Sequence, residues 1–171
     1  MIGETPFWAI SIAYWLHMLA TVVWIGGMAT LTIVVIPTAR AAIPEEAYPA
    51  FLERLRRRLD PLGWISLIVL LATGMFQMSA SPSYSGFLSI ENRWAAAILI
   101  KHLVFGGMIV VSAYQTWGLL PALNRALLRI SSGKGNADER TRLQRREVLL
   151  LRVNFALSVL VLALTALARA A

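Results

Sequence analysis

The sequence predicts an all-α integral membrane protein, a bundle of four transmembrane helices, from three observations. Hydrophobic residues make up 58% of the 171 positions and the mean hydropathy is +0.66, which exceeds what one soluble core requires. Four apolar stretches are each long enough to cross a bilayer, since a span takes about 20 residues. The polar segments between them are rich in arginine. We therefore expect one transmembrane domain over residues 1–171, in contact with the lipid bilayer.

The helices are expected at approximately residues 7–37, 61–80, 94–120 and 147–168. The first stretch is longer than a bilayer core, so we expect it to tilt or to project beyond the membrane. It lacks the basic start of a cleaved signal peptide. Asp60 as an N-cap and Pro61 in the first turn predict the start of the second helix, and Pro121 is expected to interrupt the third.

Residues 38–60 and 121–146 are expected to be cytoplasmic loops. They hold five and seven Lys or Arg, against one between the second and third helices, and basic loops stay in the cytoplasm. Four spans then place both termini on the non-cytoplasmic side of a bacterial-type inner (plasma) membrane. Within the first loop, AYPAFLERLRRRL indicates either a short amphipathic helix on the membrane surface or a solvated connector.

Several function classes are not expected for this chain. It has no cysteine, which excludes disulfides, thiolate metal sites, iron–sulfur clusters and covalently attached c-type haem. The net charge of +7 comes from arginines that flank apolar segments, so we interpret it as a topology signal and expect no nucleic-acid partner. Hydrolase, zinc-protease and phosphate-loop motifs are missing from the sequence.

The strongest site candidates are His17 and His102, the only histidines, because ionisable residues are rare inside apolar stretches. His17 lies ten residues past Phe7 and His102 eight past Trp94, which places them about 15 and 12 Å from the outer helix ends. A porphyrin between two helices needs axial imidazoles at matched depth, small residues and apolar walls. We predict that both ligate haem b. The alternatives are a copper ion on the same residues, or histidines that only bond neighbouring helices.

Other residues are expected around such a cofactor. Trp24 shares a helical face with His17, and Gly106 shares one with His102. The glycine pairs at residues 26–27 and 106–107 are expected at close helix–helix or helix–cofactor contacts, since glycine otherwise weakens a helix.

Two basic residues are candidates for binding haem propionates. Lys101 points about 100° away from His102, so it either reaches the outer surface, binds a propionate or replaces His102 as axial ligand. Arg93 is a second propionate candidate, or a simple anchor at the membrane boundary. Methionines are soft ligands that suit Cu(I), although they also serve as ordinary packing residues: Met18, Met28, Met75, Met78 and Met108.

Three stretches resemble the CopD-like membrane proteins, named for copper resistance protein D. They are HMLATVVWIGGM at residues 17–28, LLATGM at 70–75, and WAAAILIKHLVFGGM leading to LLPAL at 94–123. The last helix fits only by its hydrophobicity. The resemblance implies a link to copper uptake. It also implies a more distant similarity to protoporphyrinogen oxidases of the HemJ type, b-haem proteins whose ligands would correspond to His17 and Lys101; His102 directly after Lys101 departs from that pattern.

The expected function is electron transfer by a b-type haem between the first and third helices. A quinone or a periplasmic carrier would exchange electrons with it. Because one haem near the outer face cannot carry an electron across a whole bilayer, a homodimer or a membrane redox complex is implied. A copper uptake permease and a HemJ-like porphyrinogen oxidase are the alternatives, so whether the protein is an enzyme stays open.

Overall fold

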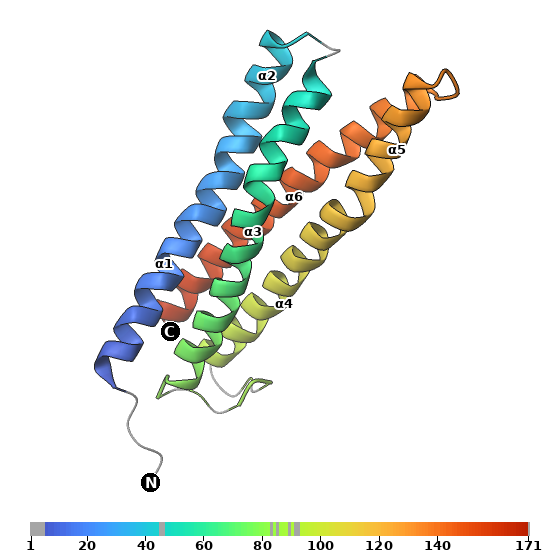
Figure 1. Ribbon diagram of the computed structural model, residues 1–171. Coiled ribbons are helices and arrows are strands. Elements are labelled where there is room, and N and C mark those ends of the chain that lie inside the picture. Colours follow the sequence, from blue (N-terminus) through green and yellow to red (C-terminus); the bar gives the residue numbers. More distant parts are fainter. Residues whose placement is uncertain are drawn as a thin grey trace.

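The computed structural model describes residues 6–44, 47–82, 84, 86–88, 90 and 93–170. Over these residues the chain forms four long helical segments and no strand (Figure 1). All four are long and apolar enough to cross a membrane: Phe7–Ala42, Tyr48–Ser79, Arg93–Ser131 and Asp138–Ala170. The protein is a multi-pass membrane protein, and the predicted all-α membrane bundle is confirmed.

Two of the four segments contain a π-helical turn. The first segment consists of α1 (Phe7–Ala29), the turn η1 (Thr30–Val35) and α2 (Ile36–Ala42). The second is the single helix α3 (Tyr48–Ser79). The third consists of α4 (Arg93–Ala113), the turn η2 (Tyr114–Leu119) and α5 (Leu120–Ser131), and the fourth is α6 (Ala137–Ala170).

The helix α3 begins well before its expected start. It starts at Tyr48 and runs through Pro61, so the interpretation of Asp60 as an N-cap is wrong. Residues 50–59 consist mostly of strong helix formers, and Arg57 donates a 2.6 Å hydrogen bond to Glu53 one turn earlier. This propensity outweighs the loss of one backbone hydrogen bond at the proline. Residues 48–60 therefore extend the second span and do not form a separate surface helix.

The predicted loop over residues 121–146 is also mostly helical. Between α5 and α6 only residues 132–136 lie outside helices, and Gly133 there has a φ of +73°, a left-handed conformation that suits glycine. The prolines do not end their helices either. Ile36 and Leu120, directly before Pro37 and Pro121, donate their N–H groups to carbonyls five residues earlier. These wide π-turns make room for each proline ring, so the helix continues.

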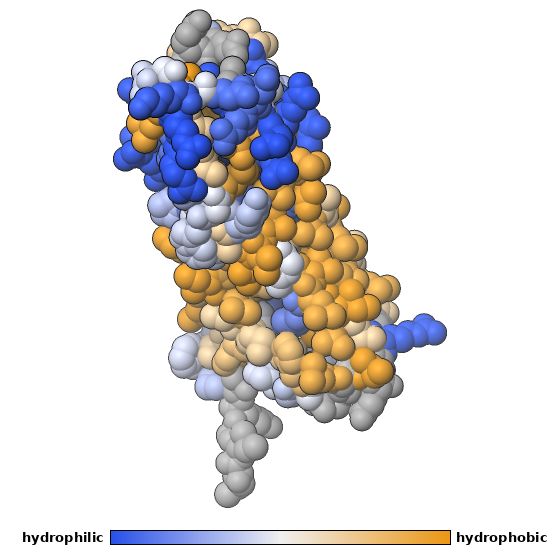
Figure 2. Space-filling view, turned by 90° about the vertical axis from the view of Figure 1, so that its right-hand side faces the viewer, coloured by the Kyte–Doolittle hydropathy of each residue, from blue (hydrophilic) through white to orange (hydrophobic). Residues whose placement is uncertain are grey.

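The helices associate as two pairs. The main contacts are those of α1 with α3 and of α4 with α6, whereas contact between the pairs runs chiefly through α6 against α1. A small apolar core of Trp24, Met28, Leu67 and Met108 lies where the pairs meet. The face of the bundle shown in Figure 2 is apolar along most of its length, with a hydrophilic region at one end.

Both ends of the described chain lie at the same end of the bundle as the connection from α3 to α4 (Figure 1). The connections from α2 to α3 and from α5 to α6 lie at the opposite, arginine-rich end. Following the predicted orientation, we call these the outer end and the inner end.

Candidate functional site

A cavity of about 450 Å³ opens in the outer half of the bundle, between the two helix pairs. We call it the outer cavity. His17 and Trp24 reach it from α1, and Lys101 and His102 from α4. Its volume falls in the range typical of ligand sites, about 300–1,000 Å³. Four of the predicted site residues are thus brought together in one cavity.

The ring of His17 is held by α3. Its Nδ1 atom lies 2.8 Å from Oγ1 of Thr73, whose hydroxyl hydrogen bonds the carbonyl of Val69 at 2.5 Å. Because that hydroxyl has only one hydrogen, Nδ1 of His17 is the donor and Nε2 keeps its lone pair. Gly74 fits closely against the same ring, since a Cβ there would lie 3.4 Å from Cε1 of His17.

The ring of His102 is oriented by its own helix. Its Nδ1 atom lies 2.7 Å from the carbonyl oxygen of Ile98, which can only accept, so Nδ1 again carries the hydrogen. Phe87 packs edge-on against the ring, with the centroids 5.5 Å apart. Within the described part of the chain, neither Nε2 atom has a hydrogen-bond partner. In their neutral form, both imidazoles therefore present an Nε2 lone pair, which makes them suitable metal ligands.

The charged residues of the outer cavity are cationic. Lys101 and Arg169 line it, and no carboxylate does among the described residues. The guanidinium of Arg169 lies 5.2 Å above the ring of Tyr14. Arg93, the predicted second propionate contact, is exposed at the first residue of α4 and does not line the cavity. The second cation comes from α6 and was not singled out from the sequence.

The paired glycines do not lie at close helix contacts. A Cβ added at any of the four would meet no atom within 4 Å: Gly26, Gly27, Gly106 and Gly107. Gly106 is also not among the residues that line the outer cavity. The expectation of close helix packing at these positions is therefore wrong. Close approach occurs instead at Gly74 and at Gly63, where a Cβ would lie 3.2 Å from the ring of Trp24.

Methionine sulfur atoms are present in the same region. Three of the five candidate methionines line the outer cavity: Met18, Met78 and Met108. The described residues contain no group of three or more His, Asp or Glu that could hold a metal ion. The outer cavity thus offers two imidazoles and soft thioethers as possible ligands, besides the amine of Lys101.

A family model for copper resistance protein D matches residues 53–168, more than half of the chain. The chain belongs to the CopD family. In this CopD protein the match includes most of α6, the helix whose sequence resembled the family only in its hydrophobicity. The match does not include α1, which carries His17. Neither the comparison with curated proteins nor that with solved structures gives a significant match.

A buried polar network separates the outer cavity of this CopD protein from a smaller inner one. Trp24 and Ser158 join α1 to α6, and Asn154 donates through Nδ2 to Oγ of Ser112 at 2.8 Å. Trp24 lines both cavities. Which helices these bonds join could not be predicted from the sequence, because small polar residues in a span do not show which helix they face.

Proposed function

We propose that the outer cavity holds haem b, with Nε2 of His17 and Nε2 of His102 as axial ligands. The supporting observation is the pair of imidazoles, one from each helix pair, that line one cavity with their Nδ1 atoms already committed to hydrogen bonds. Such bonds fix the ring orientation and raise the basicity of the ligating nitrogen.

The rest of the outer cavity suits this prosthetic group. Apolar side chains such as Leu70, Phe105 and Met108 form walls for a macrocycle. Lys101 and Arg169 complement two carboxylates, the charged groups that a haem carries at its edge. The described lining holds two cations and no carboxylate, which favours an anionic apolar ligand over a bare metal cation.

His17 and His102 would together hold the haem, which would supply one-electron transfer when bound. We therefore propose a membrane electron-transfer protein of the CopD family that exchanges electrons with a quinone or a periplasmic carrier. The outer cavity occupies only one half of the bundle, so transfer across the membrane requires a second copy or a redox partner. If Lys101 replaced His102 as ligand, a HemJ-like porphyrinogen oxidase would fit better.

Copper uptake is the second candidate. The family carries the name of copper resistance, and the three methionines of the outer cavity offer sulfur ligands beside the two imidazoles. Cu(I) prefers such soft ligands. In this alternative copper is the cargo, and its path inward would have to pass Trp24 and Ser158.

Absorption spectroscopy and metal analysis of the purified protein, expressed with ample haem and copper, test both candidates. We expect the low-spin spectrum of a haem with two nitrogen ligands. His17→Ala and His102→Ala should each lose haem or turn it high-spin. Leu19→Ala and Leu103→Ala, on exposed positions of the same helices, should not.

Two results would contradict the proposal. A colourless protein that retains copper would favour copper uptake. A spectrum that His102→Ala leaves unchanged, while Lys101→Ala removes one ligand, would favour the porphyrinogen oxidase.

A further inference from the structure

A second cavity, of about 160 Å³, lies in the inner half of the bundle, and we call it the inner cavity. Among the described residues that line it, three are charged: Arg56 and Asp60 from α3, and Glu147 from α6. Two carboxylates against one guanidinium give this lining one excess negative charge when all three are ionised.

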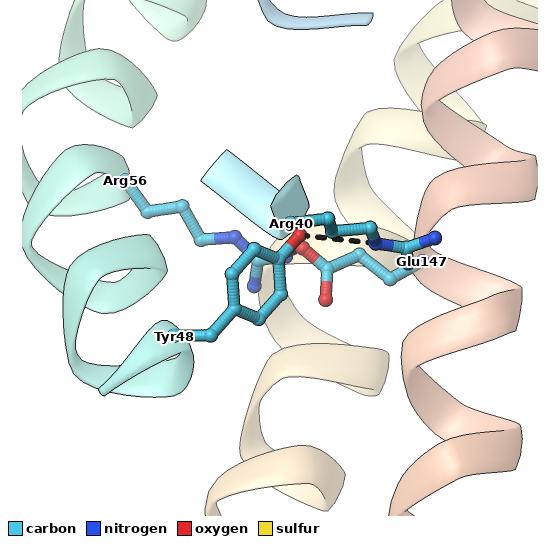
Figure 3. Close-up of polar contacts among 4 residues, drawn as sticks. All are labelled: Arg40, Tyr48, Arg56 and Glu147. Carbon is cyan, nitrogen blue, oxygen red and sulfur yellow. Dashed lines mark hydrogen bonds and ion pairs between the residues drawn. The ribbon is translucent and has the colours of Figure 1, made fainter. Parts of the chain in front are cut away.

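The ion pair between Arg56 and Glu147 accounts for two of these charges. Figure 3 shows the two side chains pointing toward one another from α3 and α6. Glu147 is only 3% exposed, so its carboxylate depends on this partner. Nearby, Arg40 on α2 bonds the hydroxyl of Tyr48 and does not line the cavity (Figure 3). Asp60 lies one turn after Arg56 on α3 and also interacts with its charge, so two carboxylates share one guanidinium and one negative charge of the lining stays unbalanced.

Asn154 provides an independent sign of a missing ligand. Its side chain is 0% exposed, and its Nδ2 donates to Oγ of Ser112, whose own hydrogen bonds the carbonyl of Met108. These bonds fix the amide orientation and leave Oδ1 as a buried acceptor with no partner among the described residues. A buried oxygen in this state is costly unless a donor or a cation satisfies it. Asn154 lines the inner cavity and not the outer one.

The π-helical turn η2 also faces this cavity, through Gln115 and Thr116. Such turns occur frequently at functional sites. Asp60, Gln115 and Asn154 each bring side-chain oxygen to the lining, and hard cations prefer oxygen ligands. Among the described lining residues two carboxylates share one guanidinium, so the unbalanced charge matches a monovalent ion better than a divalent one.

We propose that the inner cavity binds a monovalent alkali cation, with the carboxylate of Asp60 and Oδ1 of Asn154 as ligands. The ion pair of Arg56 with Glu147 forms one wall and holds α3 against α6. This site is separate from the outer cavity and does not depend on what the outer cavity holds.

Sodium titration of the purified full-length protein in detergent tests the site. Trp24 and Trp64 both line the inner cavity, so their fluorescence reports on it. Sodium chloride replaces choline chloride at constant ionic strength and pH, and a saturable change in fluorescence is expected. Asp60→Asn should weaken sodium binding at least tenfold. Glu53→Gln, an exposed carboxylate on the same helix, should leave it unchanged.

If the Asp60→Asn protein does not fold, variants that move the carboxylate from residue 60 to residue 154 still test the site. Asn154→Asp adds a carboxylate at the second ligand and should tighten sodium binding, and the double variant with Asp60→Asn should bind sodium again. Fluorescence that responds equally to sodium and choline would overturn the proposal and leave a cavity that holds only water or protons. An Asp60→Asn protein with wild-type sodium affinity, or an Asn154→Asp protein with no change, would also overturn it.

Discussion

The indole N–H of Trp24 on α1 donates a 3.0 Å hydrogen bond to Oγ of Ser158 on α6. The hydroxyl of Ser158 in turn donates to the carbonyl of Asn154, one turn earlier on the same helix. Trp24 lines both cavities, so this bond lies at their boundary and ties the two helix pairs together.

Removing this bond should destabilise the bundle by about 1 kcal/mol, the order of magnitude of interhelical hydrogen bonds in membranes. Ser158→Ala and Trp24→Phe should each lower the free energy of unfolding, measured by denaturation from mixed micelles. The double variant should lose less than the sum of the two single losses. Trp15→Phe, at a position that is 63% exposed, is the control and should have no effect. Additive losses would show that the two residues are not coupled.

Thr73 should act as a positioning residue for His17. In Thr73→Val the hydroxyl that accepts from Nδ1 is gone, while the side-chain volume is nearly kept. We expect haem affinity to fall by about tenfold to a hundredfold, as when the hydrogen-bond partner of a metal ligand is removed. Thr73→Ser should restore it, because the hydroxyl returns. Equal affinities for the Val and Ser variants, measured by haem titration of the apoprotein, would rule out this role.

The space beside His17 should limit the size of residue 74. Gly74→Ala places a Cβ at ordinary van der Waals distance from the imidazole, so haem binding should survive. Gly74→Val adds two methyl groups beside the ring and should lower the haem-to-protein ratio. Gly106→Val is the matched control on α4, where an added Cβ meets nothing within 4 Å. A Val variant at residue 74 with full haem content would contradict the close contact.

The cations of the outer cavity should affect the midpoint potential and the affinity of a bound haem. A nearby positive charge favours the reduced state, so Lys101→Met and Arg169→Met should each lower the midpoint potential. Each should also weaken haem binding about tenfold, as expected for the loss of a charge-assisted hydrogen bond. Arg93→Met should change neither quantity, because Arg93 lies outside the cavity. An effect of Arg93→Met as large as that of Arg169→Met would support the prediction from the sequence that Arg93 binds a haem propionate.

The orientation of the bundle can be measured with reporters. A reporter fused after Ala171 should be periplasmic, and one inserted at Gly133, in the connection between α5 and α6, should be cytoplasmic. The opposite pattern would invert the bundle and place the histidines near the cytoplasmic face.

The four spans could be predicted because lipid demands about 20 apolar residues in each, a signal that no other environment produces. The inner ends of these spans could not be predicted. Arginine marks a cytoplasmic loop by its charge, yet arginine, leucine and glutamate are strong helix formers. Residues 48–60 therefore fit a cytoplasmic loop by their charge and a helix by their propensity. The structure shows that they are helical, because α3 continues from them through Pro61.

The candidate site was predictable where a residue type is rare in its surroundings. His17 and His102 stand out in apolar stretches, and both line the outer cavity. Arg169 resembles any arginine that anchors the end of a span, and sequence spacing does not show that it lines the outer cavity while Arg93 does not. Thr73 is equally inconspicuous, because its role depends on the rotation of α3 relative to α1.

The pairing of α1 with α3 and of α4 with α6 has a consequence for biogenesis. Each pair consists of consecutive spans, so each can enter the bilayer as a helical hairpin before the hairpins associate, as in two-stage assembly of membrane proteins. The outer cavity, which takes one histidine from each hairpin, exists only after the hairpins dock. A ligand that contacts both histidines can therefore bind only at or after this last step of assembly.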